Sequence, residues 1–244
     1  MAEILQNAIP FRVVAHAALP GIKPLDHDGW IQQDDAFAGQ MALRDWFIAH
    51  DRDAVFAQSG ACNAAMADVL AQVLSIVKGR AGYTVMDDAV LRPDGVHVPL
   101  DGHPMLTAAR LVQEDLCLHE KRGDEHVMTA AVLCFPASWT LAEKIGRPLS
   151  VIHRLVDSYD DNIGRRVQRL FDGVQVGRPL WRYNVMRYQS AELFHPRREN
   201  APRQVDDDGQ GDYLRSEHQA LVRMPQSGAV LFAIHTYLVH EPLT

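Results

Sequence analysis

Five β-rich runs, interrupted once by a helical block, constrain the fold of this chain more than any other feature. The first two runs are separated by the turn Arg122–Glu125, and the last two by the turn Met224–Gly228. Short turns of this kind join antiparallel neighbours, so each pair of runs predicts a β-hairpin. The five runs are Arg110–Leu118, Val127–Phe135, Leu180–Tyr188, Tyr213–Arg223 and Ala229–Val239.

The helical block lies between the second and third runs. Thr140 and Glu143 have the spacing of a capping box, and Gly146 predicts the end of that short helix. A second short element spans Leu149–His153, and a third helix is indicated by apolar residues at helical spacing: Ile163, Val167, Leu170 and Phe171. This order predicts an α+β domain, a five-stranded antiparallel sheet with helices on one face. The PAS fold has the same element order.

Helical patterns dominate the N-terminal part of the chain. Apolar positions predict one helix over Phe37–Ile48 and a second over Met66–Val77, followed by a short hairpin around Pro93–Gly95. We therefore expect residues 1–105 to form a helical extension that packs on a PAS-like domain of residues 106–244, the two making one compact unit. The polar segment Glu199–Asp212 is expected to be a mobile loop.

Composition excludes several classes of protein. The 244 residues are 47% hydrophobic and 23% charged, with a net charge of −7, which argues against nucleic acid as a partner. No apolar run approaches the roughly 20 residues that span a bilayer, and no signal peptide is recognisable. The three cysteines, Cys62, Cys117 and Cys134, form no C-x-x-C pair, which indicates reduced thiols and a cytoplasmic location.

One histidine stands in an apolar segment of the helical block. His153 ends the run Val151-Ile152-His153, and a lone imidazole in such a place is either a core histidine or the proximal ligand of a haem. His119 and His126 flank a turn and are expected to be exposed. The chain has no G-x-G-x-x-G or P-loop motif and no cysteine cluster, so redox chemistry would need electrons from a separate reductase.

Several stretches resemble the haem-dependent oxidative N-demethylase family, which includes the haem subunit of dimethylamine monooxygenase. They are Gln40–Arg44, Arg110–Leu118, Cys134–His153 (CFPASWTLAEKIGRPLSVIH), Gly177–Asn184 (GRPLWRYN) and Arg215–Leu238. The resemblance implies a PAS-like domain that binds haem b. It also implies oxidation of the N-methyl group of a methylated amine by dioxygen, with release of formaldehyde. Electrons would come from NADPH through flavin and iron–sulfur centres of reductase subunits.

The resemblance, combined with residue chemistry, assigns candidate roles. His153 is the expected iron ligand, and the propionate partners are Arg147, Arg154 and Arg182, because a guanidinium matches a carboxylate. Arg182 and Asn184 alternate on a strand and should share a face. The expected pocket residues are Asn184, Glu114, Glu217, His218 and His235. The chain departs from the family pattern at His218 and His235, where arginine is usual, and at Val185, where tryptophan often stands.

Each candidate has a plainer alternative. Arg147 and Arg154 could be surface arginines, Glu114 could be an edge charge, and His218 with His235 could be the polar face of two strands. At the level of the whole protein, two other functions are open. One is a haem-binding PAS-like sensor without turnover, and the other is a haem-free PAS-like module for a small ligand.

Overall fold

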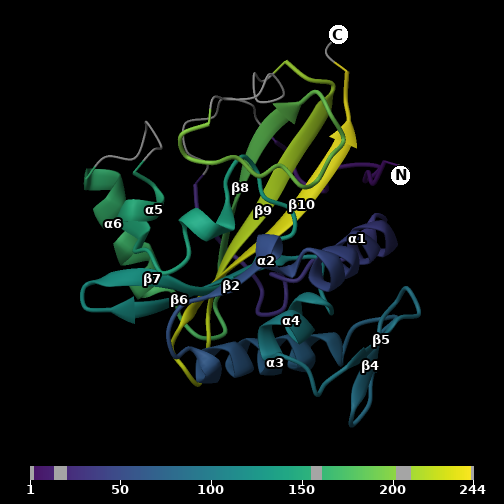
Figure 1. Ribbon diagram of the computed structural model, residues 1–244, viewed down its shortest axis with the longest axis horizontal. Helices are drawn as coiled ribbons and strands as arrows, with labels where there is room; N and C mark the ends of the chain where they lie inside the picture. Colours follow the sequence, from purple (N-terminus) through teal and green to yellow (C-terminus); the bar gives the residue numbers. More distant parts are fainter. Residues whose placement is uncertain (1–2, 14–20, 155–160, 202–209, 243–244) are drawn as a thin grey trace.

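A seven-stranded antiparallel sheet forms the centre of the protein. The computed structural model describes residues 3–13, 21–154, 161–201 and 210–242 (Figure 1). The strand order is β1-β8-β9-β10-β6-β7-β2. Their bounds are β1 Lys23–Pro24, β2 Phe56–Gln58, β6 Asp115–Arg122, β7 Glu125–Val132, β8 Leu180–Tyr188, β9 Tyr213–Arg223 and β10 Val230–His240.

The five expected strands are the five central ones, and both hairpins are confirmed. The sheet is nevertheless larger than predicted, because β1 and β2 from the N-terminal part add an edge strand on each side. These edges are two and three residues long, too short to show a two-residue period in the sequence. The chain is thus α+β, as predicted.

The first β-rich run was placed too early. Helix α4, Pro104–Ala109, occupies the preceding residues, and Pro104 at its start favours the helical φ. Arg110 to Glu114 lead from that helix into β6 as turns and bends, so Glu114 lies one residue before the strand. Leu111 and Val112 were wrongly included in the strand because they are apolar; they are buried in the core, but their backbone is irregular.

The prediction that helices lie on one face of the sheet was wrong, because the N-terminal helices, expected as an extension, cover the second face. Figure 1 shows α5 and α6 on one side of the β6–β7 hairpin and α3 and α4 on the other. On the side of α3 and α4, which we call the N-terminal face, Leu116, Ala220 and Ala233 share one apolar cluster with Val69 and Val73 of α3. The elements on this side are α1 Phe37–His50, α2 Arg52–Val55, α3 Asn63–Val77, α4, and a small sheet of β3 Thr84–Val85, β4 Ala89–Leu91 and β5 His97–Pro99.

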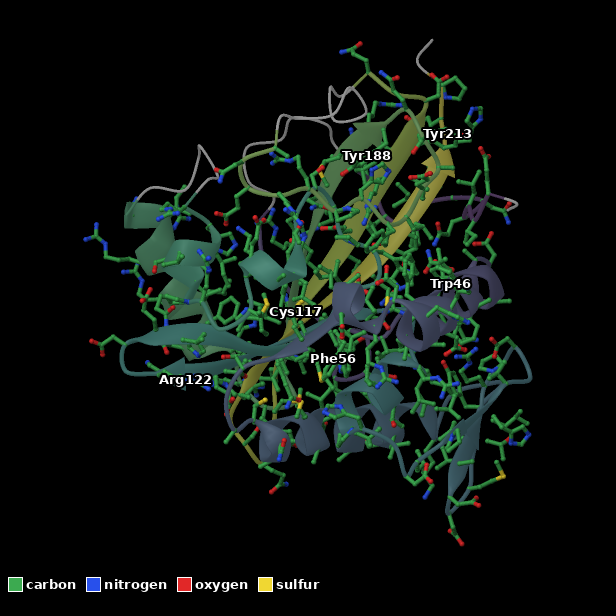
Figure 2. All side chains as sticks on the ribbon, in the orientation of Figure 1. Trp46, Phe56, Cys117, Arg122, Tyr188 and Tyr213 are labelled. Atoms are coloured by element: carbon green, nitrogen blue, oxygen red, sulfur yellow. The ribbon has the colours of Figure 1, made fainter. Side chains whose placement is uncertain are left out.

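The opposite side, called the α5 face, carries the predicted helical block. It comprises the 3₁₀ turn η1 Leu141–Glu143, α5 Leu149–Ile152 and α6 Asp161–Gly173. Cys117, in the middle of the sheet in Figure 2, clusters with Leu141, and Leu180 clusters with Leu149. The capping box was wrong in detail, because Thr140 makes no side-chain cap bond and the turn is 3₁₀. The carboxylate of Glu143 instead accepts a hydrogen bond from Glu199 N at 2.9 Å.

The boundary near residue 105 stays a prediction. The apolar cluster of the N-terminal face joins residues from both proposed parts, and the two edge strands come from the first. The expected mobile loop lies largely outside the described residues, which omit 202–209. Within the parts that the structure describes, no helix combines the length and apolarity needed to cross a membrane.

Candidate functional site

His153 is the C-cap residue of α5 and is half-buried. Its Nδ1 lies 2.9 Å from the carbonyl oxygen of Leu149. Because a carbonyl only accepts, this bond places the proton on Nδ1 and the ring's lone pair on Nε2. Burial lowers the pKa of His153, and the positive charges of Lys144 and Arg182 act in the same direction. The hydrogen bond to Leu149 raises this pKa, but the net shift is downward. The ring is therefore a neutral imidazole at pH 7, the form that binds metals.

Lys144 holds the C-terminal end of α5 through a hydrogen bond to its backbone. Its buried ammonium donates to the carbonyl of Ile152 at 2.8 Å and pairs with Glu199 at 2.7 Å. The hydrogen bond from Lys144 lowers the pKa of Glu199, and the charges of Arg147 and Arg154 act in the same direction. Both arginines are exposed. They thus belong to a cationic surface beside His153, while Lys144, which sequence reasoning missed, holds the backbone next to the ring.

Three of the predicted site residues lie on the α5 face of the neighbouring strands β8 and β9: Arg182, Asn184 and Glu217. Asn184 and Glu217 are paired across β8 and β9, and Asn184 Nδ2 donates to Glu217 Oε2 at 2.7 Å. Gln219 Nε2 donates to the same oxygen at 2.8 Å, and Arg215 lies 3.7 Å from Oε1. The buried carboxylate of Glu217 is therefore oriented by two amides and a guanidinium. Gln219 and Arg215 were not singled out in the sequence because their role depends on strand register.

Arg182 lies on the same face, as its alternation with Asn184 predicted. It is half-buried, and burial lowers its pKa, whereas the charge of Glu217 raises it. Its Nε is buried and has no hydrogen-bond partner within the described structure. A desolvated guanidinium with an unused donor is unfavourable unless an anion completes it. The charge of Arg182 also acts on His153, so these two candidates lie near each other.

The other candidates lie on the N-terminal face. His235 is fully buried between two carboxylates, with Nδ1 3.1 Å from Glu114 Oε1 and Nε2 2.9 Å from Asp34 Oδ2. His218 is opposite His235 on β9, so the two share a face as predicted, and its ring stacks on Trp181. The sheet thus separates Glu114, His218 and His235 from His153. Asp34 was missed because 201 residues separate it from His235.

The expectation that His119 and His126 are exposed was wrong. Both are buried, and both rings contact Phe171 of α6, which packs over the hairpin. Burial lowers the pKa of His119 to about 3, and its Nδ1 lies 3.1 Å from the carbonyl of Cys117. His119 is therefore a second neutral imidazole on the α5 face. His119 is thus the main alternative to His153 as a metal ligand on this face.

The charged cluster around His235 predicts a pH-dependent stability. Burial lowers the pKa of His235, but the hydrogen bonds and charges of Asp34 and Glu114 outweigh it and raise the pKa from 6.5 to about 9. A raised folded-state pKa stabilises fully below the unfolded value, so this contribution is lost as the pH rises from about 6.5 to about 9. We expect the free energy of unfolding to fall by on the order of 3 kcal/mol over that interval.

Urea unfolding at several pH values checks this expectation. His235→Gln should flatten the alkaline decline, whereas the same change at the exposed His97 should leave it intact. Burial lowers the pKa of His218 to about 4, so its contribution has the opposite sign and is lost in acid. An alkaline decline that is equally steep in His235→Gln would contradict the assignment of the charge to His235.

Among the cavities formed by the described residues, two are considered because they open at the surface. One, of about 130 Å³, is lined by Gly21, Lys23, Trp181, Arg182 and Tyr183. The other, of about 500 Å³, lies between the N-terminal segment and the outer side of α1, next to Trp46. Neither is lined by His153. Within the described ranges, no group of three or more His, Cys, Asp or Glu side chains is arranged to hold a metal ion directly.

The fold and the site define an α+β protein that presents a neutral, oriented imidazole and an incompletely paired arginine on one face of an antiparallel sheet. The sequence matches the haem-dependent oxidative N-demethylase, alpha subunit-like family over residues 21–241. That span covers most of the chain, which therefore belongs to this family.

Proposed function

We propose that this chain is the haem-binding subunit of an oxidative N-demethylase that acts on a methylated amine. Family membership supports the reaction class. The observation that carries the site is the position of His153, a neutral imidazole with its proton fixed on Nδ1, close to the desolvated Arg182. The five central strands and the helices over the α5 face would then be a PAS-like core that holds the cofactor.

The residues of the α5 face fit a haem. His153 would bind the iron through Nε2, and its bond to Leu149 would orient the ring, as an outer-shell acceptor does for metal-bound histidines. Arg182 would meet a propionate carboxylate, with Arg147 and Arg154 as exposed partners for the other. Haem b, when bound, supplies the activation of dioxygen.

The substrate would be held by the protein's own polar groups. A methylated amine is a cation at neutral pH, and Glu217 is a buried carboxylate on the proposed haem face. Asn184 and Gln219 hold its Oε2, which fixes the direction of the charge. Glu114, His218 and His235, behind the sheet, would support the strands that carry these residues rather than touch the amine.

The reaction balances only with a partner. One N-methyl group and one dioxygen, with two electrons and two protons, give the demethylated amine, formaldehyde and water. The family description names an alpha subunit, which supports the presence of other subunits. We propose that these carry NADPH, flavin and iron–sulfur sites, since the chain has no cysteine cluster and no nucleotide-binding motif.

Product analysis tests the proposed reaction. The purified protein, supplied with haem, NADPH and a reductase, should release one formaldehyde per methyl group lost from dimethylamine. Glu217→Gln removes the charge that would hold the amine but keeps the side chain's shape, so it should raise the KM more than tenfold, about 1.4 kcal/mol of binding. Haem binding without formaldehyde release from any methylated amine would contradict the proposal and favour a sensor.

A further inference from the structure

The outer side of α6 carries three exposed arginines that the proposed site does not use. Arg165, Arg166 and Arg169 are separated by one, three and four residues, a spacing that places them on one side of a helix. The opposite side of α6 packs on the sheet, where Phe171 and the partly buried Val167 belong to one apolar cluster. We call the three arginines the α6 basic face.

Neighbouring side chains do not neutralise the α6 basic face. Among the residues that the structure describes, no carboxylate lies within ion-pair distance of any of the three guanidinium groups. Asp172, an acidic residue on the same helix, pairs with Lys121 at 2.6 Å instead. Because a guanidinium binds carboxylates through a planar fork of donors, these exposed charges suit the acidic groups of another molecule.

The α6 basic face belongs to a region whose charge is opposite to that of the rest of the chain. Residues 140–200 hold 11 of the 24 lysines and arginines but 7 of the 31 aspartates and glutamates. The region is therefore positive, although the net charge of the whole chain is −7. Since salt screens charges beyond about 8 Å at physiological ionic strength, a compact acidic partner on this region would interact with its positive charges rather than with the negative remainder.

The α6 basic face lies beside the proposed haem site. Figure 1 shows α5 and α6 on the same side of the β6–β7 hairpin, and Leu149 of α5 shares an apolar cluster with Phe171 of α6. Helix α5 ends at His153, and the exposed Arg147 and Arg154 extend the positive surface around it. A protein docked on α6 would therefore be held next to the imidazole that is proposed to bind iron.

We propose that the α6 basic face is the docking surface for an acidic electron-transfer protein. The proposal rests on the proposed function, because it names the surface through which the electrons of that reaction arrive. In each encounter one electron would leave a reduced iron–sulfur cluster or flavin of the partner and reduce the ferric haem, so two encounters supply the two electrons of one turnover. Charge suits such a contact, since electrostatic steering speeds association and a small interface lets the partner leave again.

Binding to the haem-free full chain tests this surface without reference to activity. The probe is a plant-type [2Fe–2S] ferredoxin, a small acidic electron carrier, titrated by isothermal calorimetry. Arg165→Glu/Arg169→Glu should weaken its binding at least tenfold, and the milder Arg165→Gln/Arg169→Gln should have a smaller effect in the same direction. Raising NaCl from about 20 to about 500 mM should weaken the wild type similarly, because the Debye length falls from roughly 20 to roughly 4 Å.

The matched control makes the same change in net charge elsewhere. Arg52→Glu/Lys78→Glu alters two exposed positions on the helices of the N-terminal face and should leave ferredoxin binding within twofold of the wild type. Absence of ferredoxin binding to the wild type, or an equal loss in the control, would refute the docking surface. Binding of anionic phospholipid vesicles that only the α6 variant loses, with ferredoxin binding unchanged, would assign the surface to a membrane instead.

Stopped-flow reduction of the haem-loaded protein gives a second readout. The rate constant for haem reduction by reduced ferredoxin should fall at least tenfold in Arg165→Glu/Arg169→Glu, since steering contributes roughly 10–1000-fold. The Soret band and reduction by dithionite should be unchanged, which shows an intact fold. An unchanged ferredoxin rate would refute the docking surface and leave the haem assignment standing. A chain that binds no haem would overturn the proposed function, while the calorimetric comparison would still decide on the docking surface.

Discussion

His153→Ala should lack the Soret band that we expect of the wild-type protein purified with haem. Changes to the outer-shell partner of a metal ligand alone reduce metal affinity about 10–100-fold, so removal of the ligand should reduce haem affinity by more than 100-fold. We expect this large effect because His153 is the histidine that caps α5 and because its neutral ring is already oriented by the carbonyl group of Leu149. Titration of the haem-free protein with haem, followed at the Soret maximum, measures the effect.

Chemical rescue distinguishes a lost ligand from a damaged fold. His153→Gly leaves room for free imidazole, which should restore haem binding in the variant and should not increase the haem content of the wild type. His119→Ala is the matched control, because His119 is also a buried neutral imidazole on the α5 face. If His119→Ala abolishes haem binding and His153→Ala leaves it intact, then His119 is the ligand and the assignment of His153 is wrong.

The strands were predictable from sequence because they are β-rich runs bounded by turn residues, although most of them are buried on both faces. The bounds of β8 and β9 agree with the prediction, and β10 differs by one residue at each end. Tyr188 and Tyr213, labelled in Figure 2, pair at one end of β8 and β9, so the register follows from these bounds. The edge strands β1 and β2 were missed, because their place depends on contacts with distant strands rather than on a local pattern.

The candidate site was only partly predictable, and the reason is geometric. Alternation placed Arg182 and Asn184 on one face correctly, and strand pairing then brings Glu217 to them. Alternation shows which residues of a strand share a face, but it does not show which of the two faces lies against the helical block. His218 and Glu217 are neighbours on β9, and therefore point to opposite faces, although both were expected in one pocket. Lys144 and Asp34 act through partners far away in the chain.

Asp115→Ala should give the largest loss of stability. Both Asp115 and Arg44 are fully buried, and Arg44 Nη1 lies 2.9 Å from Asp115 Oδ1. The carboxylate also accepts the backbone N–H groups of Cys134 and Phe135 at 2.7 and 2.8 Å. It therefore joins α1, the start of β6 and the residues after β7. Removing it leaves one buried charge and two unpaired donors, and breaking such a pair costs about 3–5 kcal/mol.

For a chain of this size that loss should lower the Tm by roughly 6–20 °C, from about 2–4 °C per kcal/mol. Asp115→Asn keeps one acceptor oxygen and should cost less than Asp115→Ala, although it leaves the charge of Arg44 unbalanced. The double variant Arg44→Met/Asp115→Leu removes both charges and should recover much of the lost stability, because a buried ion pair is worth little more than apolar residues of similar volume. Urea unfolding of the wild type, Arg44→Met, Asp115→Leu and the double variant gives the coupling energy. A double variant no more stable than Asp115→Ala would show that the cost comes from the N–H groups of Cys134 and Phe135 rather than from the unpaired guanidinium.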